Sequence, residues 1–193
     1  MEKETILEQF EDYPVIAAVK DEDGLKKCLE SGAEIQIVFV LYGDLCNIGD
    51  IVDRLKEGGK TVIIHLDLIS GLGNREIVVD YIKNTTKADG IISTKSTLIK
   101  RAKELDFFAV MRFFMLDSMV YENVRKQIEN VKPDMIEIIP GAVPKVISRL
   151  CEFIEGKVPV IAGGMIMDKE DTMKALDAGA TAISTTRQNV WFM

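Results

Sequence analysis

Two short segments near the end of the chain combine residues that suit a phosphate group. Gly163 and Gly164 end one apolar run, and a later apolar run ends in the hydroxyl-bearing residues Ser184 and Thr185. Glycines let an anion approach the backbone closely, and the N–H groups of such turns donate hydrogen bonds to it. These segments predict a site for a small phosphorylated molecule.

Polar residues also follow other apolar runs. In chain order they are Lys20, His65, Asp67, Lys95, Arg112 and Glu137, with Gly141 in a Pro-Gly turn just after the last. Each charge alone is equally compatible with a solvent-exposed residue or a structural ion pair. Taken as a ring, they are better explained by a polar ligand that they surround.

His65 and Asp67 raise the alternative of an enzyme. Strand alternation points both side chains the same way, and phosphopentose epimerases carry a similar His-x-Asp pair that binds a metal. A metal at His65, Asp67 and Glu137, or a Glu137 base with a His65 electrophile, would make the chain a sugar- or triose-phosphate isomerase or epimerase. Those epimerases need a second histidine, and this chain has one. We therefore expect no metal, no cofactor and no catalytic residue.

Eight apolar, β-branched runs carry these residues at or near their ends. They cover residues 15–19, 35–40, 61–65, 90–93, 107–112, 135–139, 158–162 and 181–185. Nearly continuous hydrophobicity in short runs is typical of parallel strands buried on both faces, and amphipathic helical segments lie between them. The pattern predicts an α/β protein, a compact single-domain TIM-type (β/α)8 barrel over residues 1–193. An open doubly wound sheet would more often have fewer strands and a glycine-rich fingerprint after the first.

The barrel places the candidate residues together, because such barrels hold their sites at the C-terminal ends of the strands, with phosphate after strands 7 and 8. Two apolar segments flank this region. Residues 113–116 either continue the fifth strand or form a lid or partner contact. The last helix is cut short at residues 190–193, which either dock as a plug or meet a partner subunit. We expect a homodimer.

Composition describes an ordinary globular chain, with 47% hydrophobic and 28% charged residues. Its three cysteines are scattered, no apolar run approaches the roughly 18 residues of a membrane span, and the N-terminus is acidic. We expect a cytoplasmic protein that does not enter a membrane.

Seven segments and one aromatic residue resemble, in order along the chain, the glycerol uptake operon antiterminator regulatory family. They are residues 14–20, 65–72, 88–95, 112–118, 137–141, 161–164 and 182–186, together with Trp191. The resemblance implies a bacterial regulator that responds to glycerol 3-phosphate. It also implies action on the leader of glycerol-operon mRNA, where the protein prevents premature termination of transcription.

Roles for the candidate residues follow from this resemblance and from the barrel geometry. Gly163, Gly164, Ser184 and Thr185 would hold the phosphate; Lys20, Asp67, Glu137 and Gly141 would meet the polyol; Lys95, Arg112 and His65 would contact the ligand or a lid.

Net charge counts against a broad RNA surface. The chain has 24 Lys and Arg against 31 Asp and Glu, a net charge of −7. An RNA contact must therefore come from a local basic patch. The densest candidate is Lys100, Arg101 and Lys103 together with Lys95, and a second one is Arg125, Lys126 and Lys132. The alternative for both clusters is a solvated helix face held by ion pairs.

Overall fold

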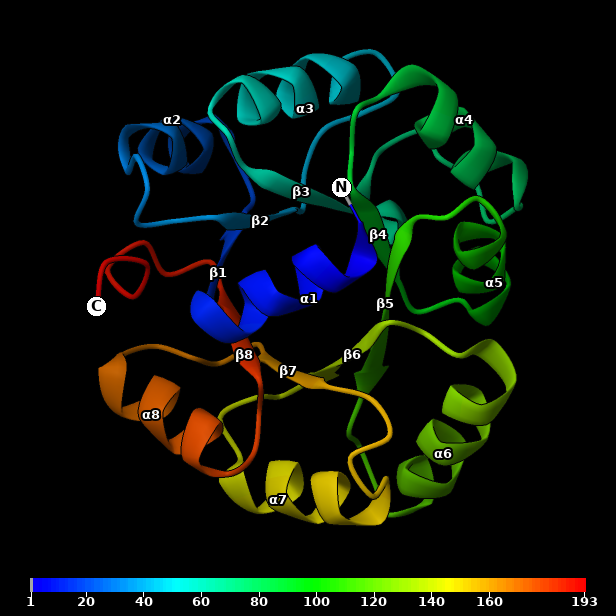
Figure 1. Ribbon diagram of the computed structural model, residues 1–193, viewed down its shortest axis with the longest axis vertical. Helices are drawn as coiled ribbons and strands as arrows, with labels where there is room; N and C mark the ends of the chain where they lie inside the picture. Colours follow the sequence, from blue (N-terminus) through cyan, green and yellow to red (C-terminus); the bar gives the residue numbers. More distant parts are fainter. Residues whose placement is uncertain (1) are drawn as a thin grey trace.

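The computed structural model describes residues 2–193, which form a closed barrel of eight parallel strands (Figure 1). Each strand pairs with the next in the chain, and the last pairs with the first. The strands are β1 (Val15–Val19), β2 (Ile37–Val40), β3 (Thr61–His65), β4 (Gly90–Ser93), β5 (Phe108–Phe114), β6 (Met135–Ile139), β7 (Val160–Gly163) and β8 (Ala182–Thr185). The predicted (β/α)8 barrel is confirmed.

Helices between successive strands surround the barrel. They are α2 (Glu22–Glu30), α3 (Ile48–Glu57), α4 (Ile77–Thr85), α5 (Ser96–Glu104), α6 (Met119–Val131), α7 (Pro144–Phe153) and α8 (Lys169–Asp177), and a 3-10 turn, η1 (Leu66–Leu68), follows β3. No helix within residues 2–193 is long and apolar enough to cross a bilayer.

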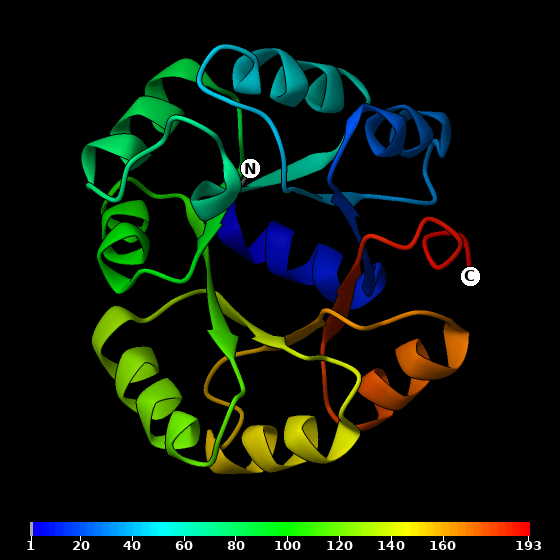
Figure 2. The ribbon, with the colours of Figure 1, turned by 180° about the vertical axis from the view of Figure 1, so that it is seen from behind.

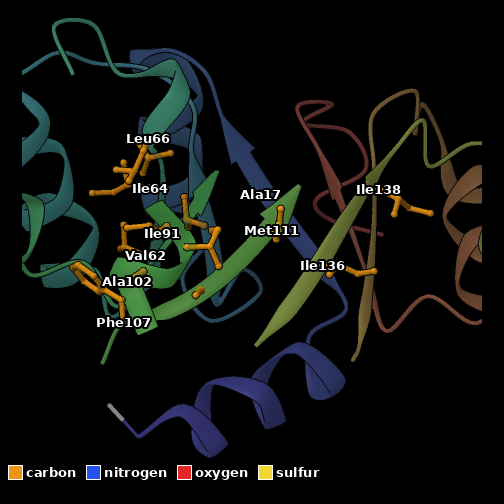
Figure 3. Close-up of a cluster of buried hydrophobic side chains, with 14 of the residues drawn as sticks. Ala17, Val62, Ile64, Leu66, Ile91, Ala102, Phe107, Met111, Ile136 and Ile138 are labelled. Carbon is orange, nitrogen blue, oxygen red and sulfur yellow. The ribbon is translucent and has the colours of Figure 1, made fainter. Parts of the chain in front are cut away.

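The strands bury side chains on both of their faces. In β2, Ile37 and Phe39 belong to the cluster inside the barrel, whereas Val38 and Val40 belong to the cluster between barrel and helices. Figure 3 shows part of this outer cluster, in which Phe107 lies close to residues of neighbouring elements. Burial on both faces explains why the strands are almost continuously hydrophobic in sequence.

An additional helix, which the sequence analysis did not predict, closes the N-terminal end of the barrel. This helix, α1 (Lys3–Asp12), lies across the barrel opening in Figure 1. Ile6 and Phe10, four residues apart and so on one helical face, are its buried residues. The Phe10 ring stacks on Phe108 at 5.5 Å and meets Phe39 edge-on at 6.5 Å between centroids. The strand ends that carry the candidate residues lie at the opposite end of the barrel.

Strand β5 is longer than predicted. Phe113 and Phe114 pair with Ile138 and Ile139 of β6, so they continue the strand and do not form a lid. Phe113 is buried, whereas the exposed apolar residues begin with Phe114 at the end of the strand and continue at Leu116 beyond it.

A docked tail takes the place of a helix after β8. Residues 188–192 form turns, and Val190 and Trp191 are buried. The indole Nε1 of Trp191 donates to the carbonyl oxygen of Thr185 at 2.8 Å. Figure 2 shows the tail between α2 and α8, in the place of an outer helix. Of the two predicted alternatives, the tail docks against its own barrel.

Candidate functional site

A cavity of about 180 Å³ opens at the C-terminal ends of the strands. It is lined by Ala18, Leu41, Arg112, Glu137 and Ile139, by residues 164–167 after β7, and by residues 184–187 at the end of β8. Drug-sized ligands occupy pockets of roughly 300–1,000 Å³. The cavity therefore suits a small metabolite, and it lies where the sequence predicts the phosphate site.

The floor of the cavity is built around the carboxylate of Glu137, which is fully buried. Strand register places Arg112 beside Glu137, and Arg112 Nε donates to Glu137 Oε2. Ser184 Oγ donates to the other carboxylate oxygen. A buried carboxylate needs such partners, because an unpaired charge in the interior is strongly unfavourable. Glu137 thus neutralises Arg112 and fixes the positions of Arg112 and Ser184.

Gly163 is the residue that makes room for this carboxylate. A Cβ atom at Gly163 would lie 2.4 Å from Glu137 Oε1 and 2.8 Å from Ser184 Oγ. Gly163 does not line the cavity, so the structure gives it a packing role beneath the predicted phosphate site.

The loops after β7 and β8 form the wall of the cavity on the predicted phosphate side. Gly164 and Met165 both have left-handed backbone conformations, with φ of 72° and 61°. None of residues 2–193 accepts a hydrogen bond from the backbone N–H of Gly164, Met165 or Thr186. Such uncommitted donors, beside a glycine that allows close approach, can bind an anion.

Thr185 ties these two loops together. Its Oγ1 donates to the carbonyl oxygen of Ile166 at 2.8 Å and accepts a hydrogen bond from the backbone N–H of Arg187 at 3.1 Å. The hydroxyl predicted to contact phosphate is therefore engaged in shaping the loops, although Thr185 does line the cavity.

Arg187 is a lining residue that the sequence analysis missed. It lies at the lip, where the cavity meets an open groove that also includes Lys20 and Lys27. Lys20 and Arg187 form no ion pair with any residue in 2–193. The available signal was a cation directly after the run of hydroxyl residues that ends at Thr186. The lip is therefore cationic, whereas Glu137 neutralises the cation of the floor.

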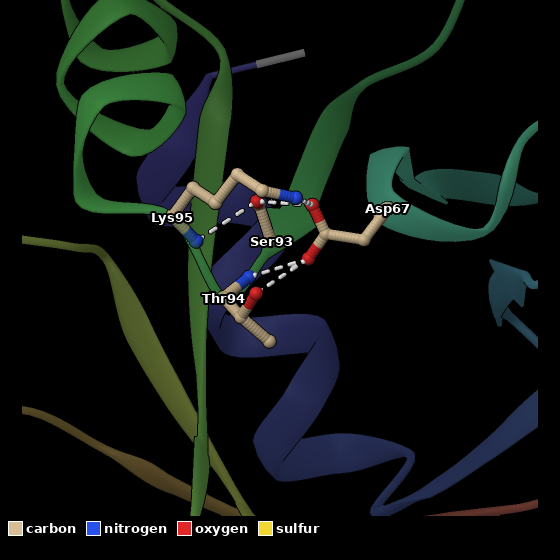
Figure 4. Close-up of polar contacts among 4 residues, drawn as sticks. All are labelled: Asp67, Ser93, Thr94 and Lys95. Carbon is tan, nitrogen blue, oxygen red and sulfur yellow. Dashed lines mark hydrogen bonds and ion pairs between the residues drawn. The ribbon is translucent and has the colours of Figure 1, made fainter. Parts of the chain in front are cut away.

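Asp67 and Lys95 pair with each other beside the cavity and do not line it. Asp67 Oδ1 accepts from Ser93 Oγ at 2.9 Å and from Lys95 Nζ at 2.8 Å, and Oδ2 accepts from the backbone N–H and the hydroxyl of Thr94 at 2.7 and 2.9 Å (Figure 4). Burial raises the pKa of Asp67, but these donors outweigh it and hold the pKa at about 2. Asp67 joins η1 to the start of α5.

His65 is buried below the mouth of the barrel, and neither ring nitrogen has a hydrogen-bond partner in residues 2–193. Burial, and then the nearby Arg112 charge, lower the pKa of His65 to about 3, so the ring is neutral at pH 7. No group of three His, Cys, Asp or Glu residues in this range could hold a metal ion. His65, Asp67 and Glu137 thus do not come together as such a group.

Gly141 packs against the end of β7. Its backbone N–H donates to the carbonyl oxygens of Gly163 and Gly164 at 2.6 and 3.0 Å, and a Cβ atom here would lie 2.7 Å from the carbonyl carbon of Ala162. The glycine fixes the loop that carries Gly164 and does not itself reach the cavity.

Of the predicted RNA-binding residues, Lys100, Arg101 and Lys103 lie on α5. Arg101 pairs with Asp80 at 2.5 Å and with Glu104 at 2.7 Å, and Lys103 pairs with Asp134. Lys100 is exposed. These contacts favour the alternative of an ion-paired helix face, and RNA binding by this patch stays a prediction.

Comparisons with known proteins agree with the resemblance seen in the sequence. A family model described as glycerol-3-phosphate responsive antiterminator matches residues 15–191. The chain is also 44% identical over 186 residues to the uncharacterized protein YgcP of Escherichia coli (strain K12), covering 96% of this chain and 95% of YgcP.

Solved structures show the same similarity. The glycerol uptake operon antiterminator regulatory protein of Listeria monocytogenes str. 4b F2365 has a TM-score of 0.85 at 32% identity, covering 92% of this chain and 94% of that chain. A glycerol uptake operon antiterminator-related protein of Thermotoga maritima MSB8 has a TM-score of 0.81 at 36% identity, covering 93% and 98%. A deoxyribose phosphate aldolase of Aeropyrum pernix, with a TM-score of 0.74 at 14% identity and coverage of 96% and 95%, shares the fold alone.

Proposed function

Because the chain belongs to the glycerol-3-phosphate responsive antiterminator family, we propose that it binds glycerol 3-phosphate in the cavity at the C-terminal ends of the strands. The observation that carries this proposal is the lining of that cavity. Gly164 and Thr186 offer free backbone donors, and Arg187 adds a positive charge beside them. This wall suits the phosphate, and the polar floor suits the hydroxyl groups of glycerol.

The bound effector would regulate a macromolecular partner. As the resemblance implies, we propose that this partner is the leader of glycerol-operon mRNA, and that the protein prevents premature termination there. The ion pairs of Arg101 and Lys103 leave little free charge on α5. Binding to the leader must therefore use other basic residues or displace these pairs.

A catalytic role receives less support from the site. Both enzyme arrangements considered from the sequence need His65 at the ligand, as a metal ligand or as an electrophile, but His65 does not line the cavity. Both carboxylate oxygens of Asp67 accept hydrogen bonds, and both oxygens of Glu137, the candidate base, are bound by Arg112 and Ser184. We propose a ligand-responsive regulator that does not turn its ligand over.

Calorimetry with glycerol 3-phosphate, glycerol and inorganic phosphate tests the effector. We expect glycerol 3-phosphate to bind and glycerol not to bind, because the phosphate dianion supplies most of the polar contacts. Thr186→Pro removes a single N–H group from the wall and should weaken glycerol 3-phosphate, whereas Thr97→Pro, at the exposed start of α5, serves as the matched control. Equal affinity for glycerol and glycerol 3-phosphate would contradict the phosphate assignment.

A further inference from the structure

The two ends of the cavity differ in electrostatic character. At the floor, Arg112 is paired with Glu137, and Lys95 beside the cavity is paired with Asp67. At the lip, Arg187 and Lys20 have no ion-pair partner within residues 2–193; the groove there is also lined by Asp21 and by Lys27, which is paired with Asp23. The lip is therefore net positive and the floor is net neutral.

From this difference, and resting on the proposed function, we propose that Glu137 makes the site selective for phosphorylated polyols over phosphorylated carboxylic acids. The phosphate lies at the lip, and the uncharged end of the ligand lies at the floor. The carboxylate of Glu137 neutralises the charge of Arg112. The floor therefore accepts hydroxyl groups and does not attract a second anionic group of the ligand.

The geometry of the floor supports this role for Glu137. Its carboxylate is fully buried, whereas the side chain of Arg112 retains 11% exposure and lines the cavity. Only Nε of that guanidinium is engaged by Glu137, which leaves its other N–H groups to meet a hydroxyl oxygen. Without the carboxylate, Arg112 would be an uncompensated cation in a poorly solvated place, and such a cation favours an anionic group.

Local packing holds the carboxylate in place. Ser184 donates to it from β8, and Gly163 on β7 leaves the space that it fills. Three adjacent strands thus cooperate to keep a negative charge under Arg112. An ion pair with a purely structural role would not need to line the cavity, whereas Arg112 and Glu137 both do.

The test compares glycerol 3-phosphate with 3-phosphoglycerate, which has the same carbon chain but carries a carboxylate at the end away from the phosphate. Binding is measured by calorimetry for the unchanged protein, Glu137→Gln and Glu137→Asp. We expect the unchanged protein to prefer glycerol 3-phosphate at least tenfold. Glu137→Gln should reduce this preference at least tenfold and increase the affinity for 3-phosphoglycerate, whereas Glu137→Asp, which keeps the charge, should retain the preference.

The gain in affinity for 3-phosphoglycerate distinguishes selectivity from structural damage, because a damaged site would lose both ligands. Arg187→Ala is the control for orientation, and it should weaken both ligands by a similar factor. Unchanged protein that binds both compounds equally well would overturn the role of Glu137 and leave the phosphate site intact, whether or not Glu137→Gln folds. Unchanged protein that binds neither compound would overturn the proposed function as well.

Discussion

Among individual residues, His65 is the buried polar group whose partners are missing. Its pKa near 3 lies below the ordinary value of 6.5, so protons bind the unfolded chain first as the pH falls. Stability is therefore lost between about pH 6.5 and pH 3, with a slope of up to about 1.4 kcal/mol per pH unit from this group alone.

His65→Leu removes both unpaired nitrogens and this titration. We expect the variant to be at least as stable as the unchanged protein at pH 7, and progressively more stable than it at lower pH. Urea unfolding of both proteins from pH 7 to pH 4 measures the difference between their free energies of unfolding. The other titratable groups are the same in both proteins, so they contribute little to this difference. If the free energies of unfolding of the two proteins change with pH in parallel, the pKa of His65 is the same in the folded and the unfolded chain, which would contradict this prediction. Affinity for glycerol 3-phosphate should stay within about tenfold, since His65 does not line the cavity.

Asp67 also makes stability fall as the pH falls, but because its charged form is stabilised in the folded protein. Its folded pKa of about 2 lies below the ordinary 3.8, so its stabilisation is complete above about pH 4 and is lost as the pH falls through about 2. The difference corresponds to about 2 kcal/mol.

Asp67→Asn should therefore lower the free energy of unfolding by about 2 kcal/mol at pH 7, with a smaller difference near pH 2. Ser93→Ala removes one of the donors and should cost less. Chemical denaturation at several pH values provides the measurement, and calorimetry adds a second result. Ligand affinity should change less than tenfold, whereas a much larger loss would restore Asp67 to the polyol site predicted from the sequence.

At the scale of elements, the docked tail is coupled to the cavity. Trp191 donates to the carbonyl oxygen of Thr185, and Thr185 lines the cavity and binds both loops of its wall. Ligand that orders this turn must also affect the indole, and Trp191 is the sole tryptophan of the chain.

We predict that saturating glycerol 3-phosphate changes the fluorescence emission of Trp191, and that deletion of residues 190–193 weakens binding. Deletion of residues 192 and 193 alone keeps the indole and its hydrogen bond, and should preserve binding. Emission that stays constant while calorimetry demonstrates saturation, together with normal binding by the longer deletion, would uncouple the tail from the site.

The strands could be predicted from the sequence because each is short, buried and bounded by turns. The runs at 61–65 and 135–139 coincide with β3 and β6. The extension of β5 was ambiguous, since Phe113 continues the same apolar pattern whether it is paired or free. Helix α1 was missed because its two buried residues, Ile6 and Phe10, stand among many charges.

The candidate site was predictable in place and not in detail. Strand ends bring Arg112, Glu137 and Ser184 to one mouth in any such barrel. Which donor meets which acceptor depends on strand register and side-chain direction, so the pairing of Asp67 with Lys95 could not be read from spacing. Gly163 shows the same limit, because the sequence does not tell whether a glycine leaves space for a neighbouring carboxylate or for a bound phosphate.

For the whole molecule, an exposed apolar surface beyond β5 bears on assembly. Leu116 and Met119 are 85% and 79% exposed, and Phe114 is 49% exposed. Large exposed apolar patches mark interaction sites, and these three residues fall within residues 114–119 of the chain.

We predict a homodimer that uses this surface. Leu116→Glu together with Met119→Glu should shift sedimentation velocity toward the monomer, while Ile77→Glu, at a 66% exposed position on α4, should have no effect. A monomer at every accessible concentration of the unchanged protein would exclude this assembly.

The contacts of helix α1 also determine when during folding this helix can be buried. It precedes every strand of the barrel in the chain, yet Phe10 packs against Phe39 of β2 and Phe108 of β5. Its apolar face has no complete binding surface until β5 has been synthesised, so it stays exposed to chaperones and proteases during that interval. A helix that precedes all the strands is thus buried after several of them have formed, and amide exchange during refolding should show α1 protected only after the central strands.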